Sequence, residues 1–317
     1  MDETFSLNPE APALVIGAAG LDIVGRLRNE LQLGSSSPAR IRTSYGGVAR
    51  NVAENLARLG QPVRLLSVVG EDQVGDQLLQ KAEQAGVDVV NVLRTANKPT
   101  GSYLGILNAR GVLQYALDDM RIMSSLSSKY LREKYTLFKE SSMLFVDMNL
   151  SKEALRTAFS LARKAHLPVC ADPTSATLAH RLLPYLQEIA LVAPNSKEAE
   201  ILCEGRVGGC GPNQGLDVAK FLVSQGVGIA IVTMAELGVS YATSETSGRV
   251  PAIHTEVTDP TGAGDAMSAA VLFALLNDIP VDEAVGLGVS AASLTLRYPG
   301  AVVPDLSLQK LYDQLVI

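Results

Sequence analysis

The sequence predicts an α/β fold, in which helices cover both faces of a parallel β-sheet and a small separate β-sheet forms a lid. After residue 125, short apolar runs alternate regularly with longer amphipathic segments, which is typical of βαβ units. In the first third of the chain, several β-type segments have no helical segment after them. Hydrophobic residues make up 47% of the 317 residues, aromatic residues only 5%, and Trp is absent. This composition suits helices packed against a buried sheet.

The apolar runs, taken in chain order, define the elements of the core. Strands are predicted at 13–17, 63–69, 87–93, 143–147, 168–171, 190–193, 227–232, 238–243 and 250–257. Helices are predicted at 48–59, 73–85, 151–164, 176–188, 196–203, 214–225, 264–277 and 282–296. No internal repeat, low-complexity segment or clean linker interrupts this order, so residues 1–317 are expected to form a single domain.

Four β segments lack helices of their own: 22–28, 40–45, 103–107 and 112–117. The last two flank Asn108-Ala109-Arg110-Gly111, a sequence typical of a hairpin turn. Because such segments cannot join a doubly wound sheet as βα units, we expect them to form a lid, inserted into the α/β core within about 20–46 and 100–120. The exposed edge strands of a small sheet need cover, and a homodimer through the lid is the expected way to supply it.

A Gly-rich turn is predicted after the first strand, and it contains Asp22. In open α/β sheets, ligands gather at the carboxyl ends of the strands, so Asp22 is well placed to contact one. The alternative is a turn-forming Asp, whose side chain bonds the nearby backbone. Position alone leaves both interpretations open.

Two adjacent glycines, Gly46 and Gly47, stand immediately before the predicted helix 48–59, and Gly60 follows it. Without side chains, the backbone at a helix start can approach a ligand closely. Asn51 lies one turn into this helix. A mid-helix Asn is a poor helix former and is commonly just exposed, but the glycine pair favours the hypothesis that Asn51 faces a ligand.

The stretch Asp259-Pro260-Thr261-Gly262-Ala263-Gly264-Asp265 precedes an apolar segment of helical length. The free N–H groups of that helix lie at Gly262 to Asp265, and a helix start without side-chain bulk attracts anions. Asp265 has two interpretations: a first-turn acid that caps the helix or matches its dipole, or a base held beside a phosphate-binding loop. Capping needs no glycines, so the Gly-Ala-Gly sequence favours the base.

Polar residues also follow other predicted strands. Asp172, the pair Asn195 and Glu198, and the stretch from Thr233 to Gly238 each come directly after a buried strand. If these strands are parallel, all of these residues share one edge of the sheet with the anion loop, which indicates a common site. Asn195 and Glu198 have an alternative role as the N-cap residue and capping-box partner of a helix.

Charge and composition exclude several partner classes. The net charge is −6, whereas a nucleic-acid binder normally shows a basic face, so polymeric nucleic acid is not an expected partner. No apolar run reaches the roughly 20 residues that span a bilayer, and Met1-Asp2-Glu3-Thr4 is unlike a signal peptide. Cys170, Cys203 and Cys210 lack paired spacing, which indicates a reducing compartment. We therefore expect a cytoplasmic protein without a membrane partner; the three histidines are not close to one another, and no zinc site is expected.

These motifs, in this order, resemble the ribokinase-like (PfkB) family of carbohydrate and nucleoside kinases. The family's C-terminal signature, Asp-Thr-Thr-Gly-Ala-Gly-Asp, is matched by Asp259 to Asp265, with Pro260 in place of the first Thr. Its other motifs are matched by Gly46-Gly47-x-x-x-Asn51-x-Ala53 through Leu59-Gly60, by Gly70-Glu71-Asp72-x-x-Gly75, and by Asn195 to Glu198. The resemblance covers almost the whole chain and implies a Rossmann-like domain with a small β lid.

The resemblance also implies roles for individual residues. Asp265 takes the proton of the substrate hydroxyl, while the backbone N–H groups of Gly262, Ala263 and Gly264 stabilise the transferring phosphoryl group. The substrate's hydroxyl groups are held by Asp22, Gly46, Gly47 and Asn51. ATP is contacted by Asn195, Glu198, Thr233, Gly238 and Thr261, with Glu198 organising Mg²⁺ through water. Many members bind a monovalent cation such as K⁺, and the implied positions are Asp259, Thr261 and the backbone near Gly300.

Three positions depart from the family pattern. Gly20 stands two residues before Asp22, where the family often has Asn. Ala235 stands where Thr-x-Gly is common, and Pro260 leaves Thr261 as the only hydroxyl of the usual pair. The nucleotide-binding loop is therefore expected to differ in detail from that of other members.

Further similarity points to one substrate. The stretches that resemble the pseudouridine kinase branch of the family are Gly46-Gly47-Val48-x-Arg50-Asn51, Ser102-Tyr103-Leu104, Asp118-Asp119-Met120 and Asp172-Pro173-x-Ser175. This resemblance implies transfer of the ATP γ-phosphate to the 5′-hydroxyl of pseudouridine, with Tyr103 and Asp119 of the lid among the substrate contacts.

Three alternatives stay open from the sequence. A ribose- or fructose-type sugar kinase, or another nucleoside kinase, would use the same chemistry. A dinucleotide-binding dehydrogenase is suggested by Gly17-Ala18-Ala19-Gly20 after the first strand, although a Gly-x-Gly-x-x-Gly motif is absent there. A non-catalytic sugar- or nucleoside-binding protein would keep the fold without turnover, and the intact Gly-Ala-Gly-Asp sequence argues against it.

Overall fold

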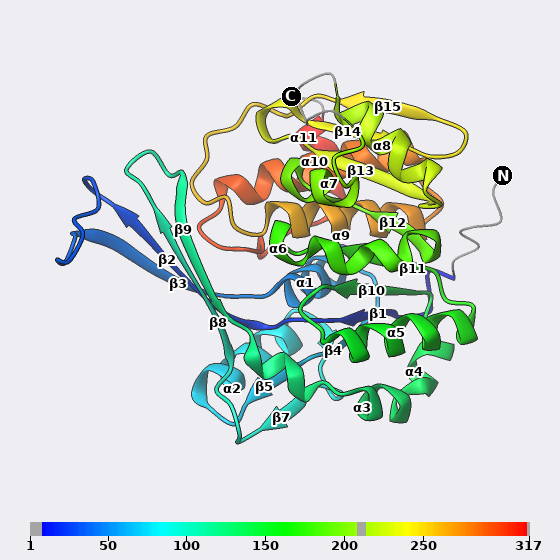
Figure 1. The fold of residues 1–317 in the computed structure, drawn as a ribbon, viewed down its shortest axis with the longest axis horizontal. Helices are drawn as coiled ribbons and strands as arrows, with labels where there is room; N and C mark the ends of the chain where they lie inside the picture. The colour runs from blue at the N-terminus through cyan, green and yellow to red at the C-terminus, as the bar shows by residue number, and fades with distance from the viewer. Residues whose placement is uncertain (1–7, 208–213, 316–317) are drawn as a thin grey trace.

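The computed structural model describes residues 8–207 and 214–315, and a nine-stranded sheet runs through its centre (Figure 1). From one edge to the other, the strands are β15 (Ser247–Val250), β14 (Val239–Ala242), β13 (Ile229–Thr233), β12 (Ile189–Val192), β11 (Val169–Asp172), β10 (Met143–Asp147), β1 (Ala13–Ile16), β4 (Val63–Leu66) and β6 (Val87–Asp88). Neighbouring strands from β13 to β6 are parallel, while β14 and β15 pair antiparallel. The predicted parallel sheet is confirmed, with an antiparallel hairpin added at one edge.

Helices cover both faces of this sheet, as predicted. Ala13 and Val15 of β1 belong to the hydrophobic cluster of one face, and Leu14 and Ile16 belong to the cluster of the other, because successive side chains of a strand point to opposite faces. The first face is covered by α1 (Val48–Leu59), α2 (Gln73–Gln84), α9 (Ala263–Leu276), α10 (Val281–Arg297) and α11 (Leu308–Leu315). The second is covered by α3 (Ser128–Glu133), α4 (Tyr135–Lys139), α5 (Lys152–Ala165), α6 (Ala176–Ala179), α7 (Ser196–Leu202) and α8 (Gly215–Ser224).

The lid is a separate four-stranded sheet that extends away from the body of the molecule (Figure 1). Its strands, in order, are β3 (Ala39–Gly46), β2 (Gly20–Leu27), β8 (Gly101–Leu107) and β9 (Leu113–Asp119). The prediction that Asp22 lies in a turn is wrong, because Asp22 is part of β2 and pairs with Ser44 and Tyr103. Since directly paired residues share a face of a sheet, these three side chains lie on the same side of the lid.

The opposite face of the lid is apolar and open to solvent. Ile41, Tyr115 and Leu117 are 67%, 58% and 66% exposed. They alternate along their strands with residues of the Asp22 face. Contiguous exposed apolar patches of this kind are uncommon on monomeric proteins.

Three predicted strands differ from the structure. The segment 63–69 is divided at Ser67, whose hydroxyl donates to Gly17 O at 2.6 Å, so that β4 joins the large sheet and β5 (Val68–Gly70) pairs with β7 (Leu93–Thr95) in a two-stranded sheet. The segment 87–93 contributes only β6 and the first residue of β7. The last strand, β15, ends at Val250, and the predicted strand 250–257 is otherwise irregular.

Helix predictions were wrong in two places. The segment 176–188 is a short α6 continued by the 3₁₀ helix η3 (His180–Glu188), which contains Pro184, a residue that cannot donate the helical N–H bond. The helices α3, α4 and α11 and the 3₁₀ helices η2 (Arg121–Ser125) and η4 (Ala235–Leu237) were not predicted. Short helices of this kind carry too few turns for a clear 3.6-residue period.

No helix within the described ranges has both the length and the apolar character that a bilayer crossing requires. Cys210 and Met1 to Thr4, on which part of the sequence analysis depended, lie outside the described residues.

Candidate active site

The N-terminus of α9 is free of side-chain bulk. Gly262 is its N-cap residue, with φ 79°, a left-handed conformation that favours glycine. A Cβ on Gly262 would overlap the backbone of Ala301, whereas a Cβ on Gly264 would meet nothing within 4 Å. The first-turn N–H groups of Ala263, Gly264 and Asp265 have no acceptor within the helix itself. Such a helix start suits an anion.

Asp265 is held by a hydrogen bond from the opposite side of the site. Asn51 Nδ2, on α1, donates to Asp265 Oδ2 at 2.7 Å. Gly262 is the N-cap residue, so Asp265 does not cap the helix, but Asp265 does lie in the first turn, where an acid matches the helix dipole. Burial raises the pKa of Asp265 to about 6; the hydrogen bond from Asn51 opposes this shift, while the charges of Asp147 and Glu198 add to it. A carboxylate that titrates near neutral pH has the proton affinity of a general base.

The glycine pair before α1 allows the lid and the body to meet closely. Gly47 is the N-cap residue of α1, with φ 94°, and a Cβ there would overlap the backbone of Ala18. A Cβ on Gly46 would overlap the carboxylate of Asp22. Both glycines are therefore required by contacts within the protein, and they bring Asp22 against the start of the helix that carries Asn51.

Asp22 is a buried carboxylate at the base of the lid. It is 5% exposed, and burial, followed by the negative charge of Asp265, raises its pKa to about 7, against the opposing effect of Arg50. A carboxyl group that titrates near neutral pH can accept a hydrogen bond from a hydroxyl or donate one to it. The structure thus brings together Asp22, Asn51 and Asp265, three residues that the sequence analysis had placed in one site.

Asp147, fully buried at the end of β10, was missed by the sequence analysis. Its Oδ2 accepts hydrogen bonds from Ala18 N at 2.7 Å and Ala49 N at 3.2 Å, and its Oδ1 accepts one from Asn149 N at 2.9 Å. One carboxylate therefore joins the loop after β1, the first turn of α1 and the loop after β10. Its position could have identified it, because Asp147 ends a buried strand just as Asp172 does.

Asn195 and Glu198 form a complete capping box at α7. Asn195 Oδ1 accepts from Lys197 N at 3.0 Å and Glu198 N at 3.1 Å, and Glu198 Oε2 accepts from Asn195 N at 2.9 Å. The capping role of this pair is therefore confirmed. Burial raises the pKa of Glu198, and burial together with the charges of Asp265 and Glu198 holds the pKa of Asp172 well above its usual range.

Thr233 and Gly238 frame the turn after β13. Thr233 N donates to Pro194 O at 2.9 Å, and Thr233 pairs with Asn195 in an isolated bridge, so it shares the sheet edge with the capping box. Gly238 has φ 84°, and a Cβ there would overlap the backbone of Val250. The β14–β15 hairpin therefore accounts for this glycine.

The loop before α9 is tied to the lid by an ion pair. Arg42 Nη2 lies 3.4 Å from Asp259 Oδ2 and donates to Thr258 O at 3.3 Å, while Thr261 N donates to Asp259 Oδ1 at 3.0 Å. A guanidinium thus already balances the carboxylate that the family resemblance assigned to a monovalent cation. Arg42 had not been singled out in the sequence.

The strand register separates two neighbouring acids of the lid. Tyr103 on β8 pairs with Asp22 on β2 and with Asp118 on β9, so Asp118 lies on the Asp22 face. Asp119 points to the opposite face, where its carboxylate accepts from Arg121 at 2.6 and 2.7 Å. Asp119 therefore does not lie at the site. Asp118 lies instead on the face of the lid that carries Asp22.

The acidic residues of this region fit a cation that arrives with phosphate groups. Among residues 8–207 and 214–315, no group of three His, Cys, Asp or Glu side chains forms a metal cage. Mg²⁺ is usually held by one or two carboxylates, water and substrate phosphates. Burial and the charges of neighbouring acids raise the pKa values of Asp172 and Asp265, so a cation beside them would relieve that repulsion.

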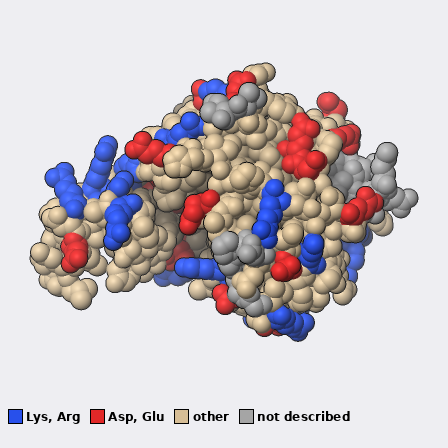
Figure 2. Space-filling view, turned by 90° about the horizontal axis from the view of Figure 1, so that it is seen from above, with Lys and Arg blue, Asp and Glu red and all other residues tan. Residues whose placement is uncertain are grey.

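A hollow separates the lid from the body, with Asp and Glu side chains around it, and the basic side chains on the projecting lid are arginines (Figure 2). The arginines on the lid strands and their hairpin are Arg26, Arg28, Arg40, Arg42 and Arg110.

A half-buried carboxylate beside a bare helix start, under a lid and at the carboxyl edge of a parallel sheet, suits phosphoryl transfer to a small acceptor. These features define a small-molecule kinase. The chain belongs to the pfkB family of carbohydrate kinases, whose family model matches residues 13–307. The family predicted from the motifs is thereby confirmed, and the dehydrogenase alternative is set aside.

Individual relatives support this assignment. A pseudouridine kinase from Escherichia coli (strain K12) is 34% identical over 93% of this chain and 93% of its own length. A guanosine-inosine kinase from Exiguobacterium acetylicum is 30% identical over 92% of this chain and 97% of its own length. An Arabidopsis thaliana ribokinase, solved in complex with ribose and ATP, covers 97% of this chain and 99% of its own with a TM-score of 0.82 and 21% identity. The last likeness confirms the ribokinase-like fold.

Proposed function

We propose that this protein transfers the γ-phosphate of ATP to the 5′-hydroxyl of pseudouridine. The observation that carries the proposal is the 2.7 Å hydrogen bond between Asn51 Nδ2 and Asp265 Oδ2, beside the N-terminus of α9. This bond fixes a carboxylate of suitable pKa next to backbone donors that attract phosphate. Phosphoryl transfer depends on such positioning and on electrostatic stabilisation.

Asp265 is the proposed general base. Asn51 occupies Oδ2, so Oδ1 is the oxygen proposed to face the substrate hydroxyl. With a pKa of about 6, Asp265 is mostly ionised at pH 7. It accepts the proton of the 5′-hydroxyl while that oxygen bonds to the γ-phosphorus; the bond from the γ-phosphorus to the bridging oxygen breaks, and ADP leaves. Because the base must be ionised, kcat/KM is expected to fall as the pH falls through about 6.

The backbone N–H groups of Gly262, Ala263 and Gly264 are the proposed anion hole for the transferring phosphoryl group. Such donors act in the transition state, where negative charge is spread over the phosphoryl oxygens. The open space around Gly264 supports this role, because contacts within the protein do not require a glycine there.

Gly264→Ala is expected to fold at least as stably as the wild type and to lose about tenfold or more in kcat/KM. Ala is the better helix former by roughly 0.5–1 kcal/mol, whereas its methyl group would occupy space assigned to the phosphoryl group. Thermal unfolding and steady-state kinetics measure the two effects. Gly286→Ala in α10, where the added Cβ would make only ordinary contacts, is the matched control and should retain full activity. Unchanged kinetics in Gly264→Ala would rule out the anion hole.

The other nucleotide contacts are proposed on the same sheet edge. Asn195, Glu198 and Thr233 would line the phosphates of ATP, with Glu198 and water holding Mg²⁺ between them. Gly238 and Thr261 would border the nucleotide. Mg²⁺ supplies charge neutralisation of the phosphates when bound. A monovalent cation such as K⁺ beside Asp259 stays a prediction, since the cation would share that carboxylate with Arg42.

The acceptor is proposed from the relatives and from the inner face of the lid. Asp22, Asn51 and the Gly46-Gly47 backbone would hold the ribose, and Tyr103 and Asp118 would face the base. Pseudouridine joins its ribose to a ring carbon and so has one more ring N–H than uridine. The carboxylate of Asp118 is an acceptor that this extra donor would satisfy.

A panel of acceptors with ATP and Mg²⁺ tests the proposal. Pseudouridine is expected to give the highest kcat/KM, at least about tenfold above uridine, because a hydrogen bond lost at a polar site costs that much or more. Phosphorus NMR of the product would locate the new ester at the 5′-oxygen. Preference for ribose, fructose, inosine or guanosine would favour the alternative sugar or nucleoside kinases. Tight nucleoside binding without turnover would indicate the non-catalytic alternative. A homodimer through the apolar outer face of the lid stays a prediction.

A further inference from the structure

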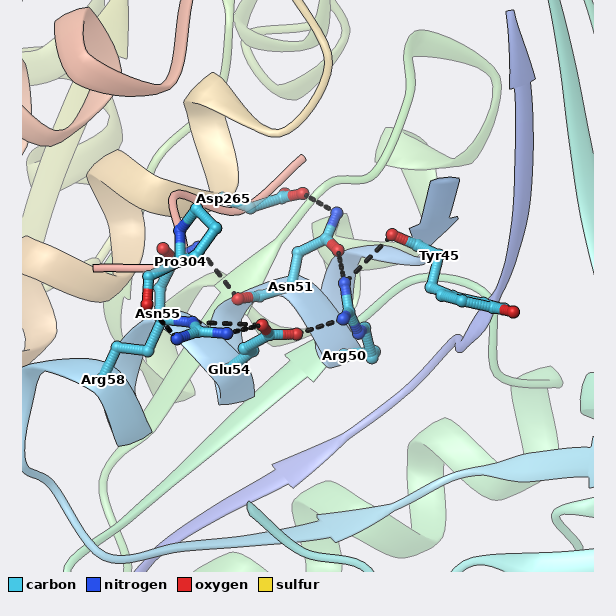
Figure 3. Close-up of polar contacts among 8 residues, drawn as sticks. All are labelled: Tyr45, Arg50, Asn51, Glu54, Asn55, Arg58, Asp265 and Pro304. Carbon is cyan, nitrogen blue, oxygen red and sulfur yellow. Dashed lines mark hydrogen bonds and ion pairs between the residues drawn. The ribbon is translucent and has the colours of Figure 1, made fainter. Parts of the chain in front are cut away.

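We infer that Arg50 is a positioning residue, which fixes the orientation of the Asn51 amide and thereby holds the carboxylate of Asp265. The inference deepens the proposed function and rests on the role given there to Asp265. Its basis is a chain of contacts that runs from Glu54 through Arg50 and Asn51 to Asp265 (Figure 3).

Arg50 is a buried cation that contacts a backbone carbonyl group and two side chains. It is 5% exposed. Its Nη1 donates to Tyr45 O at 3.0 Å and to Asn51 Oδ1 at 3.1 Å, and its Nη2 forms an ion pair with Glu54. Asn51 is 3% exposed and passes the contact on to Asp265 through its Nδ2 at 2.7 Å.

The chemistry of these groups allows only one orientation of the Asn51 amide. A guanidinium has donors and no acceptor, and an ionised carboxylate has acceptors and no donor. With Arg50 on one side and Asp265 on the other, the amide must turn its oxygen to Arg50 and its nitrogen to Asp265. Without Arg50, the carboxylate of Asp265 alone would favour this orientation, so the Asn51 amide would be held less firmly against Asp265 Oδ2.

The far end of the chain of contacts anchors Arg50. Glu54 Oε1 accepts from Arg58 Nε at 3.1 Å and Nη2 at 2.6 Å, and Arg58 Nη1 donates to Pro304 O in the C-terminal segment (Figure 3). Asn55 Nδ2 donates to Asn51 O at 2.9 Å. Arg50 and Arg58 thus share Glu54, but only Arg50 contacts Asn51, which makes Arg58 a matched comparison.

A purely structural role for Arg50 is the alternative, because removal of one partner of a buried ion pair destabilises a fold. The titration of Asp265 separates the two roles. The negative groups that act on Asp265 are Asp147 of β10 and Glu198 of α7, with Asp22 of β2 and Asp172 of β11 close enough to repel it in turn. Arg50 is the positive group that lowers the pKa of Asp265. A substitution at another residue that only destabilises the fold would leave the charge of Arg50, and therefore this lowering of the pKa, unchanged.

The test compares wild type, Arg50→Gln, Arg50→Lys and Arg58→Gln. The protein would be labelled with ¹³C at the aspartate side-chain carboxyl carbon, and the Asp265 signal assigned by its loss in Asp265→Asn. Arg50→Gln is expected to raise the pKa of Asp265 by at least about half a unit, since an opposite charge nearby lowers a carboxyl pKa by about one to three units. Arg58→Gln should leave this pKa unchanged. An unchanged pKa in Arg50→Gln, or an equal rise in Arg58→Gln, would overturn the inference.

Turnover of the same proteins supplies the second readout. Arg50→Gln is expected to lower kcat about 10–100-fold and to move the acid limb of the kcat/KM profile to higher pH. Arg50→Lys keeps the charge but not the fork of donors, so it should lower kcat about tenfold without moving the limb. If Arg50→Gln does not fold, a wild-type kcat in Arg50→Lys would refute the positioning role. If the wild type phosphorylates no acceptor, the proposed function fails, while the carboxyl titration still decides the contact between Arg50 and Asp265.

Discussion

Asp265→Asn is expected to fold like the wild type and to lose about 10²–10⁴-fold in kcat, the usual contribution of a general base. The amide oxygen at this position can still accept the hydrogen bond from Asn51 Nδ2, so the geometry of the site is kept. The amide nitrogen, however, is a donor and cannot take a proton. Steady-state kinetics with the preferred acceptor measure the loss, and ATP affinity measured by calorimetry should stay within about threefold of wild type.

Stability gives this prediction an internal check. Folding raises the pKa of Asp265 to about 6 from about 3.9 in an unfolded chain. Protonation therefore favours the fold at low pH, and that contribution is lost as the pH rises through about 6. Asn does not ionise, so its contribution to the free energy of unfolding does not fall with rising pH. Asp265→Asn should therefore be at least as stable as wild type at pH 7.5.

A matched control stands at the other end of the same helix. Asp278, just after α9, is exposed and has φ 57°, a conformation that Asn tolerates. Asp278→Asn should leave kcat and KM unchanged. A kcat of Asp265→Asn within tenfold of wild type would show that another group takes the proton.

The helices that were predicted correctly are those whose apolar periodicity and flanking residues agree on one element with one set of bounds. The helix α1 was placed at its observed bounds because its apolar stripe, its preceding glycines and Gly60 all agree; Gly60 indeed ends it with φ 101°. The start of α9 followed from the same reasoning. Composition and period thus sufficed wherever local signals were consistent.

Prediction errors arose where the same sequence pattern is compatible with two different structures. The apolar run 63–69 has the same period whether it forms one strand or two, and the division at Ser67 depends on contacts with Gly17 and the chain near Leu93. The interchange of Asp118 and Asp119 has a similar cause, because a shift of one residue reverses the face and only pairing with β8 fixes it.

Residues of the site were missed when their partners lie far away in the sequence. Arg50 was part of a motif, yet its role depends on the contact between Asn51 and Asp265, which are 214 positions apart. Arg42 lies 217 positions before Asp259 in the numbering of the chain, and their ion pair exists only because the lid folds over the anion loop. Asp147 shows most clearly how one side chain can organise several segments that the sequence leaves unrelated.

Asp147→Asn is expected to lower the free energy of unfolding by about 1–3 kcal/mol, the cost of leaving a buried hydrogen-bonding group unsatisfied. Each oxygen of the carboxylate accepts from backbone N–H groups: Oδ2 from Ala18 and Ala49, and Oδ1 from Asn149. An amide must turn its NH₂ group toward one of these sets, so a fully buried donor would face another donor. Burial raises the pKa of Asp147, so removal of the carboxylate charge offsets part of this cost. Urea titration, with the midpoint and slope fitted separately, measures the loss.

Asp88→Asn is the control for this substitution, because the side chain of Asp88 is 41% exposed, accepts from Val90 N at 3.0 Å and has only a loose ion pair with Arg64 at 3.9 Å. Its effect should stay within about 0.5 kcal/mol. The loop after β1 leads into Asp22, and the first turn of α1 leads to Asn51, so Asp147→Asn should also raise KM for the acceptor more than KM for ATP. A variant that loses stability while both KM values stay at wild type would limit Asp147 to a structural role. Full stability in Asp147→Asn would mean that its three backbone contacts do not hold these loops together.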